Sequence, residues 1–391
     1  MPRQAPPLPT ALVLYENGPD WRYATGTPIA DPALCYISPK GKTHIVVSEL
    51  EIELMRHEAT RADRIHSFAD IRKKMNGTTL SVAAMVEVLM GLEKTPPARI
   101  VVPRHFPAGL MEKLREAKLP VMVAETELVF PARALKTEAE IKHLRAAQAL
   151  NEHAMECAFA ILRAADIRRD KTLVWNGAPL TSEILRAEMN MFLVRHGATE
   201  FHGGPIIAGG SQATMPHHRG SGPLKAGELI IIDTFPRHPN GYWGDLTRTV
   251  IKGQPSAWQK EIYYTVLEAQ KLALSLIKPG VNGADVHEAV ATFFTRAGFP
   301  TGTHQGQPYG YFHGTGHGVG LDLHDPGPRT LSSVPCTLQA GMVTSVEPGL
   351  YYPQGVQKAG FGGVRIEDVV TVTTSGVKNL TKRGKTQWIL D

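Results

Sequence analysis

The sequence predicts a two-domain protein, in which a small α/β domain precedes a larger domain of long helices and glycine-rich strands. The chain has 391 residues, and a single domain usually has about 100–200 residues. Apolar residues make up 42% of it and charged residues 20%, which is typical of a protein that folds around a buried core. Strand and helix patterns alternate over residues 1–133 and give way to longer helices and strands after that point.

The first domain is predicted from short apolar runs that alternate with helical spacing of apolar residues. Strands are expected at residues 11–15, 44–47, 100–102 and 121–123, and helices at residues 49–57, 80–92 and 108–117. This alternation is typical of an α/β domain. A proline follows Phe130 and a helix start comes shortly after it, so we place the domain boundary between residues 133 and 134.

Two capping boxes mark long helices in the second domain. Thr137 and Glu140 have the spacing at which each side chain accepts a hydrogen bond from the other residue's free backbone N–H. The helix that they open has an apolar stripe formed by Ile141, Leu144, Ala147, Leu150 and Ala154. Ser256 and Gln259 open another helix, which is expected to stop at Pro279 and Gly280.

Composition excludes several classes of protein. The net charge is only 42 − 37 = +5 and no block of like charge is present, so we expect no nucleic-acid partner. No apolar run reaches the ~18 residues of a membrane span, and prolines interrupt the N-terminus where a signal peptide needs an apolar stretch. We therefore expect a cytoplasmic protein with no membrane partner. Cys35, Cys157 and Cys336 lie far apart, which argues against a disulfide framework.

Two aspartates stand at strand ends that a hairpin would bring together. Residues 229–232 are apolar and lead into Asp233, and the chain returns as a second strand from Asp245 to Val250. A hairpin centred near residue 239 would place Asp233 opposite Asp245, close enough to share a metal. A tight two-residue turn would instead pair Asp233 with Arg248, so the sequence leaves the register open. Taken alone, both aspartates could simply end strands and cap turns.

Glycine occupies every second position from Gly314 to Gly320. In an extended strand, this spacing puts His313, Thr315 and His317 on one face and almost nothing on the other. The pattern favours close approach of another backbone or of a ligand. It is not an HExxH zinc motif, because no glutamate follows the first histidine and the glycines oppose a helix.

Two more carboxylates lie on strands near the C-terminus. Residues 343–346 lead into Glu347, and a strand of residues 364–370 carries Arg365 and Glu367 on one face. A buried glutamate needs a compensating cation, which is either Arg365 or a metal. With the two aspartates and one histidine, these glutamates form a hard, oxygen-rich ligand set that two divalent ions can share. Manganese suits such a set better than the thiolate-rich sites of structural zinc.

The ordered set of these residues resembles the creatinase and aminopeptidase family of "pita-bread" metallopeptidases, in its Xaa-Pro peptidase branch. The resemblance covers nearly the whole chain and rests on Asp233, Asp245 in GDLTRT, His317 in HGTGHGVGL, Glu347 in VEPG and Glu367 in RIED. It implies an α+β fold, in which a pita-bread catalytic domain (residues 134–391) follows a smaller creatinase-like α/β N-terminal domain (residues 1–133).

The resemblance also implies that these five residues hold two divalent metal ions, with Mn²⁺ as the first choice and Co²⁺ or Zn²⁺ as alternatives. Asp233 would bind one metal, and His317 with Glu347 the other. Asp245 and Glu367 would bridge the two ions, and Glu347 would exchange protons with the attacking water.

Three further residues match the family's substrate side, and a fourth matches a residue that supports the metal ligands. His217, His313 and His324 match histidines that hold the scissile carbonyl and stabilise the tetrahedral intermediate, and Arg365 matches an arginine that supports the metal-site carboxylates. The implied reaction is hydrolysis of the Xaa-Pro bond at the N-terminus of a peptide by a metal-bridging hydroxide, as in an Xaa-Pro aminopeptidase. The alternative is an Xaa-Pro dipeptidase (prolidase), which accepts only dipeptides. The implied partners are a proline-containing peptide and a second copy of the chain in a homodimer.

Two positions depart from the family pattern. The interval from Asp233 to Asp245 is one residue longer than usual, which implies a bulged or enlarged hairpin. Asp325 follows His324 where many members of the family carry glutamate. Neither departure removes a predicted ligand.

Three remote alternatives remain at the level of the sequence. Arg195, His196 and Gly197 resemble the phosphohistidine motif of the histidine phosphatases, but here the motif ends a helical segment midway along the chain. Methionine aminopeptidase shares the ligand order, but it generally lacks an N-terminal domain of this kind. A non-catalytic peptide-binding member of the fold is disfavoured by the intact ligand set.

Overall fold

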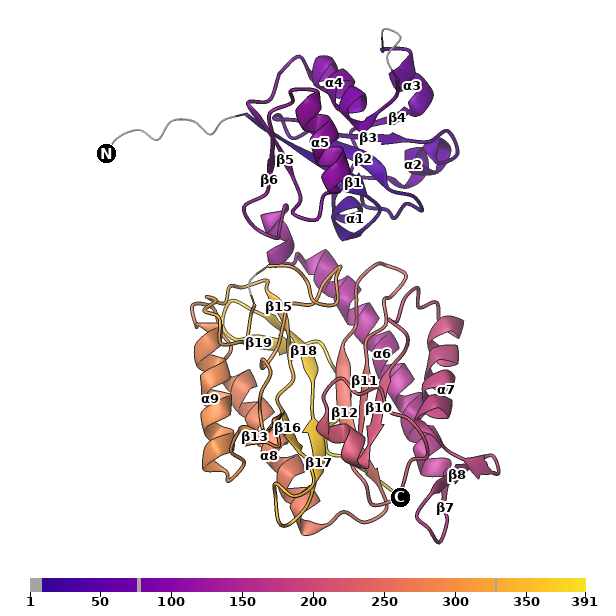
Figure 1. Cartoon of the computed structure of the whole chain (residues 1–391), viewed down its shortest axis with the longest axis vertical. Coiled ribbons are helices and arrows are strands. Elements are labelled where there is room, and N and C mark those ends of the chain that lie inside the picture. The colour runs from indigo at the N-terminus through magenta and orange to yellow at the C-terminus, as the bar shows by residue number, and fades with distance from the viewer. Residues whose placement is uncertain (1–8, 76–78, 328) are drawn as a thin grey trace, which may run out of the picture. The chain divides into compact units, whose positions relative to one another are not determined.

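The computed structural model describes residues 9–75, 79–327 and 329–391 (Figure 1). Residues 1–8, on which the prediction of no signal peptide partly rests, lie outside the described residues. The chain divides into two compact units, Met1–Arg133 and Ala134–Asp391.

The first unit contains a six-stranded sheet with the strand order β4-β3-β2-β1-β5-β6. Its strands are β1 (Thr10–Glu16), β2 (Ala33–Ile37), β3 (Thr43–Val47), β4 (Arg64–Ser67), β5 (Arg99–Val102) and β6 (Val121–Val123). Its helices are α1 (Pro19–Thr25), α2 (Ile52–Glu58), α3 (Phe68–Arg72), α4 (Val82–Glu93) and α5 (Ala108–Glu116). The four predicted strands and three predicted helices are confirmed, whereas β2, β4, α1 and α3 were not predicted. β1 pairs in antiparallel with β2 and in parallel with β5, so the sheet is mixed.

The long helices belong to the second unit: α6 (Glu138–Ala164), α7 (Ser182–Arg195), α8 (Ala257–Leu276) and α9 (Gly283–Arg296). Both predicted capping boxes are present, at the start of α6 and of α8. The predicted apolar stripe of α6 is buried along its whole length. Short 3₁₀ helices, η1 (Pro131–Ala134) and η2 (Gly210–Thr214), add to these elements.

The central strands of the second unit lie between two pairs of helices, α6 with α7 and α8 with α9 (Figure 1). One sheet has the order β10-β11-β12-β20, a second β15-β18-β19, and the remaining strands form the sheets β16-β17, β13-β14 and β7-β8-β9. The central strands are β10 (Ile206–Gly209), β11 (Ile230–Thr234), β12 (Leu246–Lys252), β15 (Val343–Val346), β16 (Gly349–Tyr352), β17 (Gly362–Arg365) and β18 (Asp368–Val372). The outer strands are β7 (Asp166–Ile167), β8 (Leu173–Trp175), β9 (Ala178–Pro179), β13 (Gly302–His304), β14 (Gln307–Tyr309), β19 (Val377–Asn379) and β20 (Ile389–Leu390).

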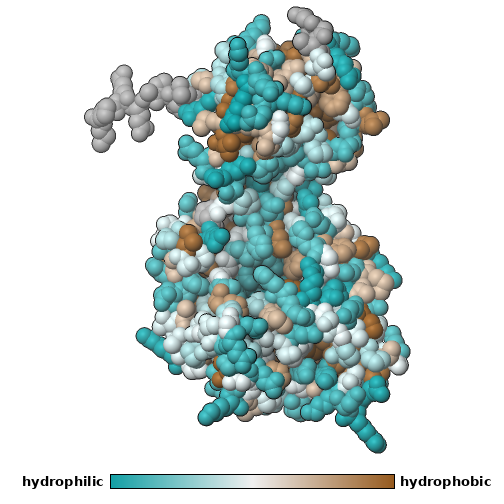
Figure 2. Space-filling model, in the orientation of Figure 1, coloured by the Kyte–Doolittle hydropathy of each residue, from teal (hydrophilic) through white to brown (hydrophobic). Residues whose placement is uncertain are grey.

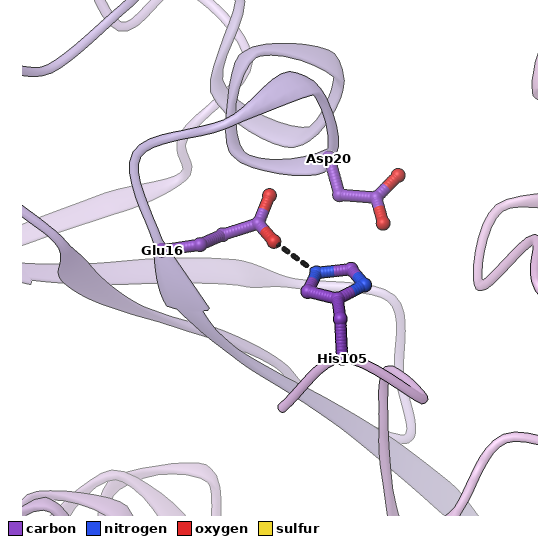
Figure 3. Close-up of side chains that lie close together, drawn as sticks. All are labelled: Glu16, Asp20 and His105. Atoms are coloured by element: carbon purple, nitrogen blue, oxygen red, sulfur yellow. Dashed lines mark hydrogen bonds and ion pairs between the residues drawn. The ribbon is translucent and has the colours of Figure 1, made fainter. Parts of the chain in front are cut away.

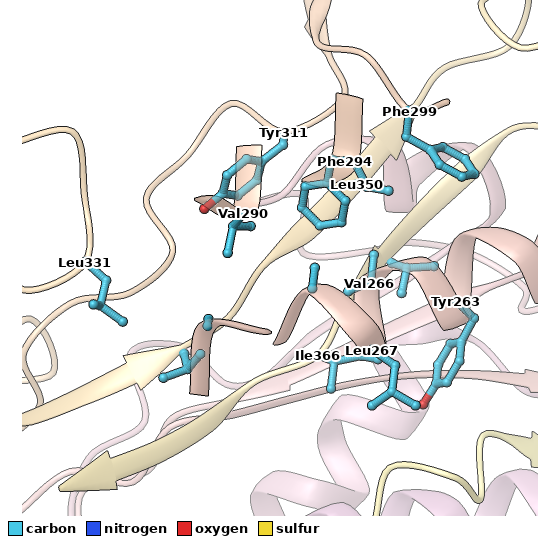
Figure 4. Packing of buried hydrophobic residues seen from close by; sticks show 14 of the residues in the cluster. Tyr263, Val266, Leu267, Val290, Phe294, Phe299, Tyr311, Leu331, Leu350 and Ile366 are labelled. Atoms are coloured by element: carbon cyan, nitrogen blue, oxygen red, sulfur yellow. The ribbon is translucent and has the colours of Figure 1, made fainter. Parts of the chain in front are cut away.

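Each helix pair buries its apolar face against these strands. Tyr263, Val266 and Leu267 of α8 pack with Leu350 of β16 and with Ile366, in a cluster that also includes residues of α9 (Figure 4). A second cluster joins α6 and α7 to β10, β11 and β12. Burial of apolar surface stabilises a fold by roughly 25 cal/mol per Å². These two clusters therefore stabilise the positions of the strands that carry the predicted site residues.

Three details of the predicted strands are wrong. Asp233 pairs with Thr247, which is neither of the two registers considered for the hairpin. The strand predicted at residues 364–370 is interrupted, since β17 ends at Arg365 and β18 begins at Asp368. The glycine-rich segment is extended but makes only isolated bridges, from Gly316 to Leu331 and from Gly318 to Thr344.

The surface and the cysteines carry little sign of other functions. Figure 2 shows apolar side chains in small groups among hydrophilic ones on the face that it presents. No helix within the described ranges is both long enough and apolar enough to span a membrane. Cys35, Cys157 and Cys336 are free thiols, and burial raises the pKa of each of them.

Candidate metal centre

The β11–β12 hairpin presents Asp233 and Asp245 to the interior of the second unit. Asp233 lies within β11, and Asp245 directly precedes β12. Gln148 of α6 fixes the backbone of Asp245 on both sides, since its amide donates to the Asp245 carbonyl over 2.8 Å and accepts from the Asp245 N–H over 3.0 Å. A Cβ atom at Gly244 would lie only 2.8 Å from the carbonyl oxygen of Ala147, so glycine allows α6 to approach the hairpin this closely.

The glycine-rich segment lies against β15, as its pattern predicted. A Cβ atom at Gly316 would lie 1.9 Å from the carbonyl oxygen of Ser345, which leaves no room for a side chain. The hydroxyl of Ser345 accepts a hydrogen bond from the N–H of His317 over 3.0 Å and donates to Oε1 of Glu347 over 2.9 Å. One serine therefore orients two of the predicted metal ligands.

The predicted ligands converge at one point. Nε2 of His317 lies 3.4 Å from Oδ2 of Asp245 and 3.3 Å from Oε1 of Glu347. Ligand atoms of Asp245, His317 and Glu367 all lie within 4.8 Å of one another, a spacing that could hold a metal ion. Asp233 is linked to the group through Arg365 and Thr247.

Arg365 and Thr247 connect Asp233 to Glu367. Nη2 of Arg365 lies 2.7 Å from Oδ2 of Asp233, and its Nε donates to the hydroxyl of Thr247 over 3.2 Å. The Thr247 hydroxyl donates to Oε2 of Glu367 over 2.8 Å. Both Arg365 and Glu367 therefore point into the site, although a break in the strand separates them.

The donor set fits divalent cations. Asp233, Asp245, Glu347 and Glu367 bring four carboxylates together, and Arg365 and His317 are the cationic groups that contact them. Oδ1 of Asp233 is buried and accepts no hydrogen bond from any residue that the structure describes. An orphaned carboxylate oxygen beside other buried carboxylates costs free energy, and a hard divalent cation would satisfy it.

Burial and mutual repulsion perturb the titration of these groups. Burial raises the pKa of Asp245 to about 7, and it raises the pKa values of Asp233 and Glu367 as well. For His317, burial opposes protonation, but the hydrogen bond with Asp245 and the charge of Glu347 raise its pKa to about 9. In the metal-free protein, protons partly replace the missing cationic charge.

These pKa shifts predict how the stability of the metal-free protein depends on pH. Asp245 and His317 both hold protons more tightly in the folded state than at their ordinary pKa values of 3.8 and 6.5. Their contribution to stability is therefore complete below those values and is lost as the pH rises through about 7 and about 9. We expect the Tm of chelator-treated protein to fall between pH 5 and pH 9, as measured by calorimetry. Because metal ions bind deprotonated ligands, the Tm difference between metal-loaded and metal-free protein should widen over this range. A metal-free Tm that rises with pH would contradict this assignment.

The three predicted substrate-side histidines lie in different surroundings. The ring of His324 lies 4.2 Å from that of His317, centroid to centroid. His217 is exposed and follows Pro216, whose carbonyl oxygen lies 3.5 Å from Nη1 of Arg365. Burial lowers the pKa values of His313 and His324, which favours their neutral forms.

His313 is less available to a substrate than its predicted role requires. Its Nε2 lies 2.9 Å from the hydroxyl of Tyr351, and its Nδ1 lies 2.8 Å from the carbonyl oxygen of Gly314. Tyr351 also accepts a hydrogen bond from Nη1 of Arg365 over 2.9 Å. Tyr351 has no distinguishing signal in the sequence, because a tyrosine within an apolar strand is ordinarily a core residue.

Two aromatic residues pack beside the loop that carries His324. The indole N–H of Trp243 donates to the carbonyl oxygen of Leu321 over 3.1 Å. The ring of His202 stacks on Trp243 with centroids 4.6 Å apart, and its φ of +40° is unusual for a residue other than glycine. Neither contact has a signal in the sequence, because the loops that make it have no regular pattern.

A second group of carboxylates and histidine lies in the first unit, where Glu16, Asp20 and His105 point toward one another (Figure 3). Nε2 of His105 lies 2.6 Å from Oε2 of Glu16. Asp20 pairs with Arg133 over 2.5 Å, and both of these side chains are buried. Each carboxylate thus has a cationic or hydrogen-bonding partner, and ion pairing is sufficient to explain the group.

Comparison with known proteins decides the family. Residues 142–374, more than half of the chain, match the model of metallopeptidase family M24. The chain belongs to this family. Its M24 fold is the pita-bread fold implied by the sequence, so the predicted resemblance and fold class are confirmed. Membership makes the chain a metallopeptidase.

The segment of Arg195, His196 and Gly197 forms the end of α7 and the turn after it in this M24 protein. The alternative of a histidine phosphatase is therefore wrong.

Several M24 relatives are named Xaa-Pro peptidases. The chain is 28% identical over 374 residues to an Xaa-Pro dipeptidase of Pyrococcus horikoshii, covering 95% of this chain and 92% of that protein. It is 30% identical over 395 residues to Xaa-Pro aminopeptidase 1 of Streptomyces coelicolor, covering 93% and 76%. The crystal structure of the P. horikoshii prolidase matches with a TM-score of 0.77 and 26% identity, covering 96% of this chain and 95% of that one.

Proposed function

We propose that the chain is an Xaa-Pro aminopeptidase, which removes the N-terminal residue of a peptide when proline is the second residue. The convergence of Asp245, His317, Glu347 and Glu367, with Asp233 held beside them by Arg365, carries this proposal. The relationship to the Streptomyces aminopeptidase supports it.

The five ligands would hold two divalent cations, for which Mn²⁺ is our first choice over Co²⁺ and Zn²⁺ because oxygen donors dominate the set. When bound, such a pair supplies Lewis acidity that lowers the pKa of a water molecule and polarises a carbonyl. Ser345 and Thr247 orient Glu347 and Glu367 for this purpose, and Arg365 pairs with Asp233.

Proton transfer falls to Glu347 in this proposal. The Glu347 side chain is 17% exposed, whereas Glu367 is only 2% exposed. A carboxylate at the open side of the site can take a proton from an attacking water and return it to the departing imino nitrogen of proline. His324, kept neutral by burial, can donate an N–H to the carbonyl oxygen as negative charge develops on it.

A panel of four peptides tests the proposal. We expect chelated protein reloaded with Mn²⁺ to cleave an Xaa-Pro-Xaa tripeptide, and to cleave the matched Xaa-Ala-Xaa control far more slowly, as measured by chromatography of the released amino acid. The other two peptides are an Xaa-Pro dipeptide and a methionyl tripeptide without proline. Cleavage of the methionyl peptide alone would contradict Xaa-Pro specificity.

The second candidate is an Xaa-Pro dipeptidase, favoured by the names of the P. horikoshii relatives. Cleavage of the dipeptide but not of the tripeptide would replace the aminopeptidase with this candidate. We also propose that the chain forms a homodimer, for which light scattering of the metal-loaded protein is the direct measurement.

A further inference from the structure

The loop that follows His317 is closed on itself by a hydrogen bond. The N–H of Asp325 donates to the carbonyl oxygen of Gly318 over 2.9 Å. Closure brings the residues at the two ends of the loop together, so the rings of His317 and His324 lie 4.2 Å apart. The distance between a proposed metal ligand and a proposed substrate-binding histidine is thus set by this loop.

The carboxylate of Asp325 fills the interior of the loop. Its Oδ1 accepts a hydrogen bond from the N–H of Asp322 over 3.4 Å. A Cβ atom at Gly320 would lie 2.6 Å from its Oδ2, so a glycine at that position makes room for the carboxylate. The Asp325 side chain is only 3% exposed, and a carboxylate buried this deeply requires a compensating charge.

Lys136 supplies that charge. Its Nζ lies 2.6 Å from Oδ2 of Asp325, and its side chain is only 5% exposed. The backbone of Lys136 is fixed as well, since its N–H donates to the carbonyl oxygen of Gly341 over 2.7 Å. The next residue, Thr137, is the N-cap of α6.

Helix α6 also holds the hairpin that carries the two predicted aspartate ligands. Gln148 binds the backbone of Asp245 on both sides, and Asn151 donates to the carbonyl oxygen of Thr234 over 2.5 Å. The helix that fixes the aspartate hairpin therefore begins two residues after the lysine that fixes the His324 loop. Helix α6 therefore connects the aspartate hairpin to the His324 loop and fixes the spacing between them.

We propose that Lys136 is a positioning residue, whose ion pair with Asp325 holds His324 against the metal ligands and thereby sustains turnover. The inference rests on the proposed function, because the role of His324 in turnover belongs to that proposal. Lys136 touches neither the predicted ligands nor the substrate-side histidines in any contact described above, and it acts through Asp325 and the loop.

A double-mutant cycle with His324 tests this inference. We expect Lys136→Met to lower kcat about 10–100-fold, the usual effect of removing a supporting partner, with KM and metal content close to those of the parent. Lys136→Arg keeps the charge and should recover most of the lost activity. When His324→Ala is already present, adding Lys136→Met should lower kcat by less than a further factor of about two. The reason is that the effects of residues that act as a unit are not additive. Lys271→Met, which removes an exposed lysine paired with Glu268, is the matched control and should leave kcat unchanged.

Hydrogen exchange provides a readout that does not depend on activity. In Lys136→Met, amides of residues 318–326 should exchange at least about tenfold faster than in the parent, while those of α8 stay unchanged. If the single variant folds poorly, Lys136→Met/Asp325→Asn removes both charges and serves in its place.

Unchanged exchange in the loop, or effects that multiply in the His324→Ala background, would overturn the positioning role. A parent that cleaves no Xaa-Pro peptide would instead disprove the proposed function. In that case, the exchange measurement still decides whether Lys136 holds the loop.

Discussion

Asp245→Asn is expected to abolish peptidase activity while making the metal-free protein more stable. The substitution removes one proposed bridging ligand, and the Lewis acidity lost with a metal is worth several kcal/mol. Since each 1.36 kcal/mol is a factor of ten in rate, kcat/KM should fall at least about a thousandfold. In the metal-free protein, however, ionised Asp245 is unfavourable, because burial raises its pKa to about 7. Asparagine removes this charge, and the free energy of unfolding at pH 8 should rise by about 1–3 kcal/mol.

The two opposite effects call for paired measurements. Kinetics and metal content after Mn²⁺ reloading report the loss of function, and thermal melts in chelator report the gain in stability. The stability gain should shrink at pH 5, where Asp245 is already protonated in the metal-free protein. Asp170→Asn, the same change at an exposed turn residue, should alter neither quantity. A metal-free Asp245→Asn protein that melts below the parent at pH 8 would show that the carboxylate is a structural group and not a metal ligand.

Arg365→Met should produce the largest loss of folding stability among the site variants. The guanidinium is 3% exposed and pairs with Asp233 at 2.7 Å, and it also donates to Thr247 and Tyr351. Its removal leaves the Asp233 carboxylate buried without a counter-charge, which typically costs about 3–5 kcal/mol. Denaturant unfolding of the metal-free variant measures this cost.

Two further variants test whether the loss of stability comes from the buried pair of Arg365 with Asp233. Arg365→Lys should recover little of the lost stability, because an ammonium cannot reach Asp233, Thr247 and Tyr351 together as the planar guanidinium does. Arg104→Met removes an exposed arginine paired with exposed Glu127 and should cost less than about 1 kcal/mol. Equal losses from the buried and the exposed arginine would rule out a special role for the Asp233 pair.

The ligand set could be predicted because carboxylates at the ends of apolar strands are expensive to bury. A run of buried residues precedes or surrounds each of Asp233, Glu347 and Glu367. A carboxylate buried at such a position needs a compensating cation. The structure brings these side chains to one place. The sequence therefore indicated which side chains the fold would bring together, and their role as metal ligands stays a prediction.

The hairpin register could not be predicted in the same way. Counting residues assumes a regular turn, but the chain between β11 and β12 makes a smaller turn of its own, in which the His238 N–H donates to the Tyr242 carbonyl. Arg237 bridges both to Trp243 within the hairpin and to Glu200, which lies 37 residues earlier in the chain. The contact with Glu200 depends on a segment far away in the sequence, so no local pattern reveals it.

The residues that support the site were also missed, for a related reason. Gln148 and Asn151 lie on the buried face of α6, among the apolar residues from which the helix is predicted. A buried polar residue on such a stripe must find a hydrogen-bond partner. Polar interruptions of an apolar helix face are therefore a signal that could have pointed to the hairpin.

The three free thiols, of which Cys35 and Cys336 are buried and Cys157 is half-buried, have a practical consequence for spectroscopy. Because burial raises the pKa values of Cys35, Cys157 and Cys336, little thiolate is available at neutral pH to react with an alkylating dye. The natural chain can therefore serve as its own background for site-specific labelling, without prior removal of cysteines. A single cysteine introduced at an exposed position would accept a fluorophore or a spin label selectively, and the movements of each unit could be followed in solution.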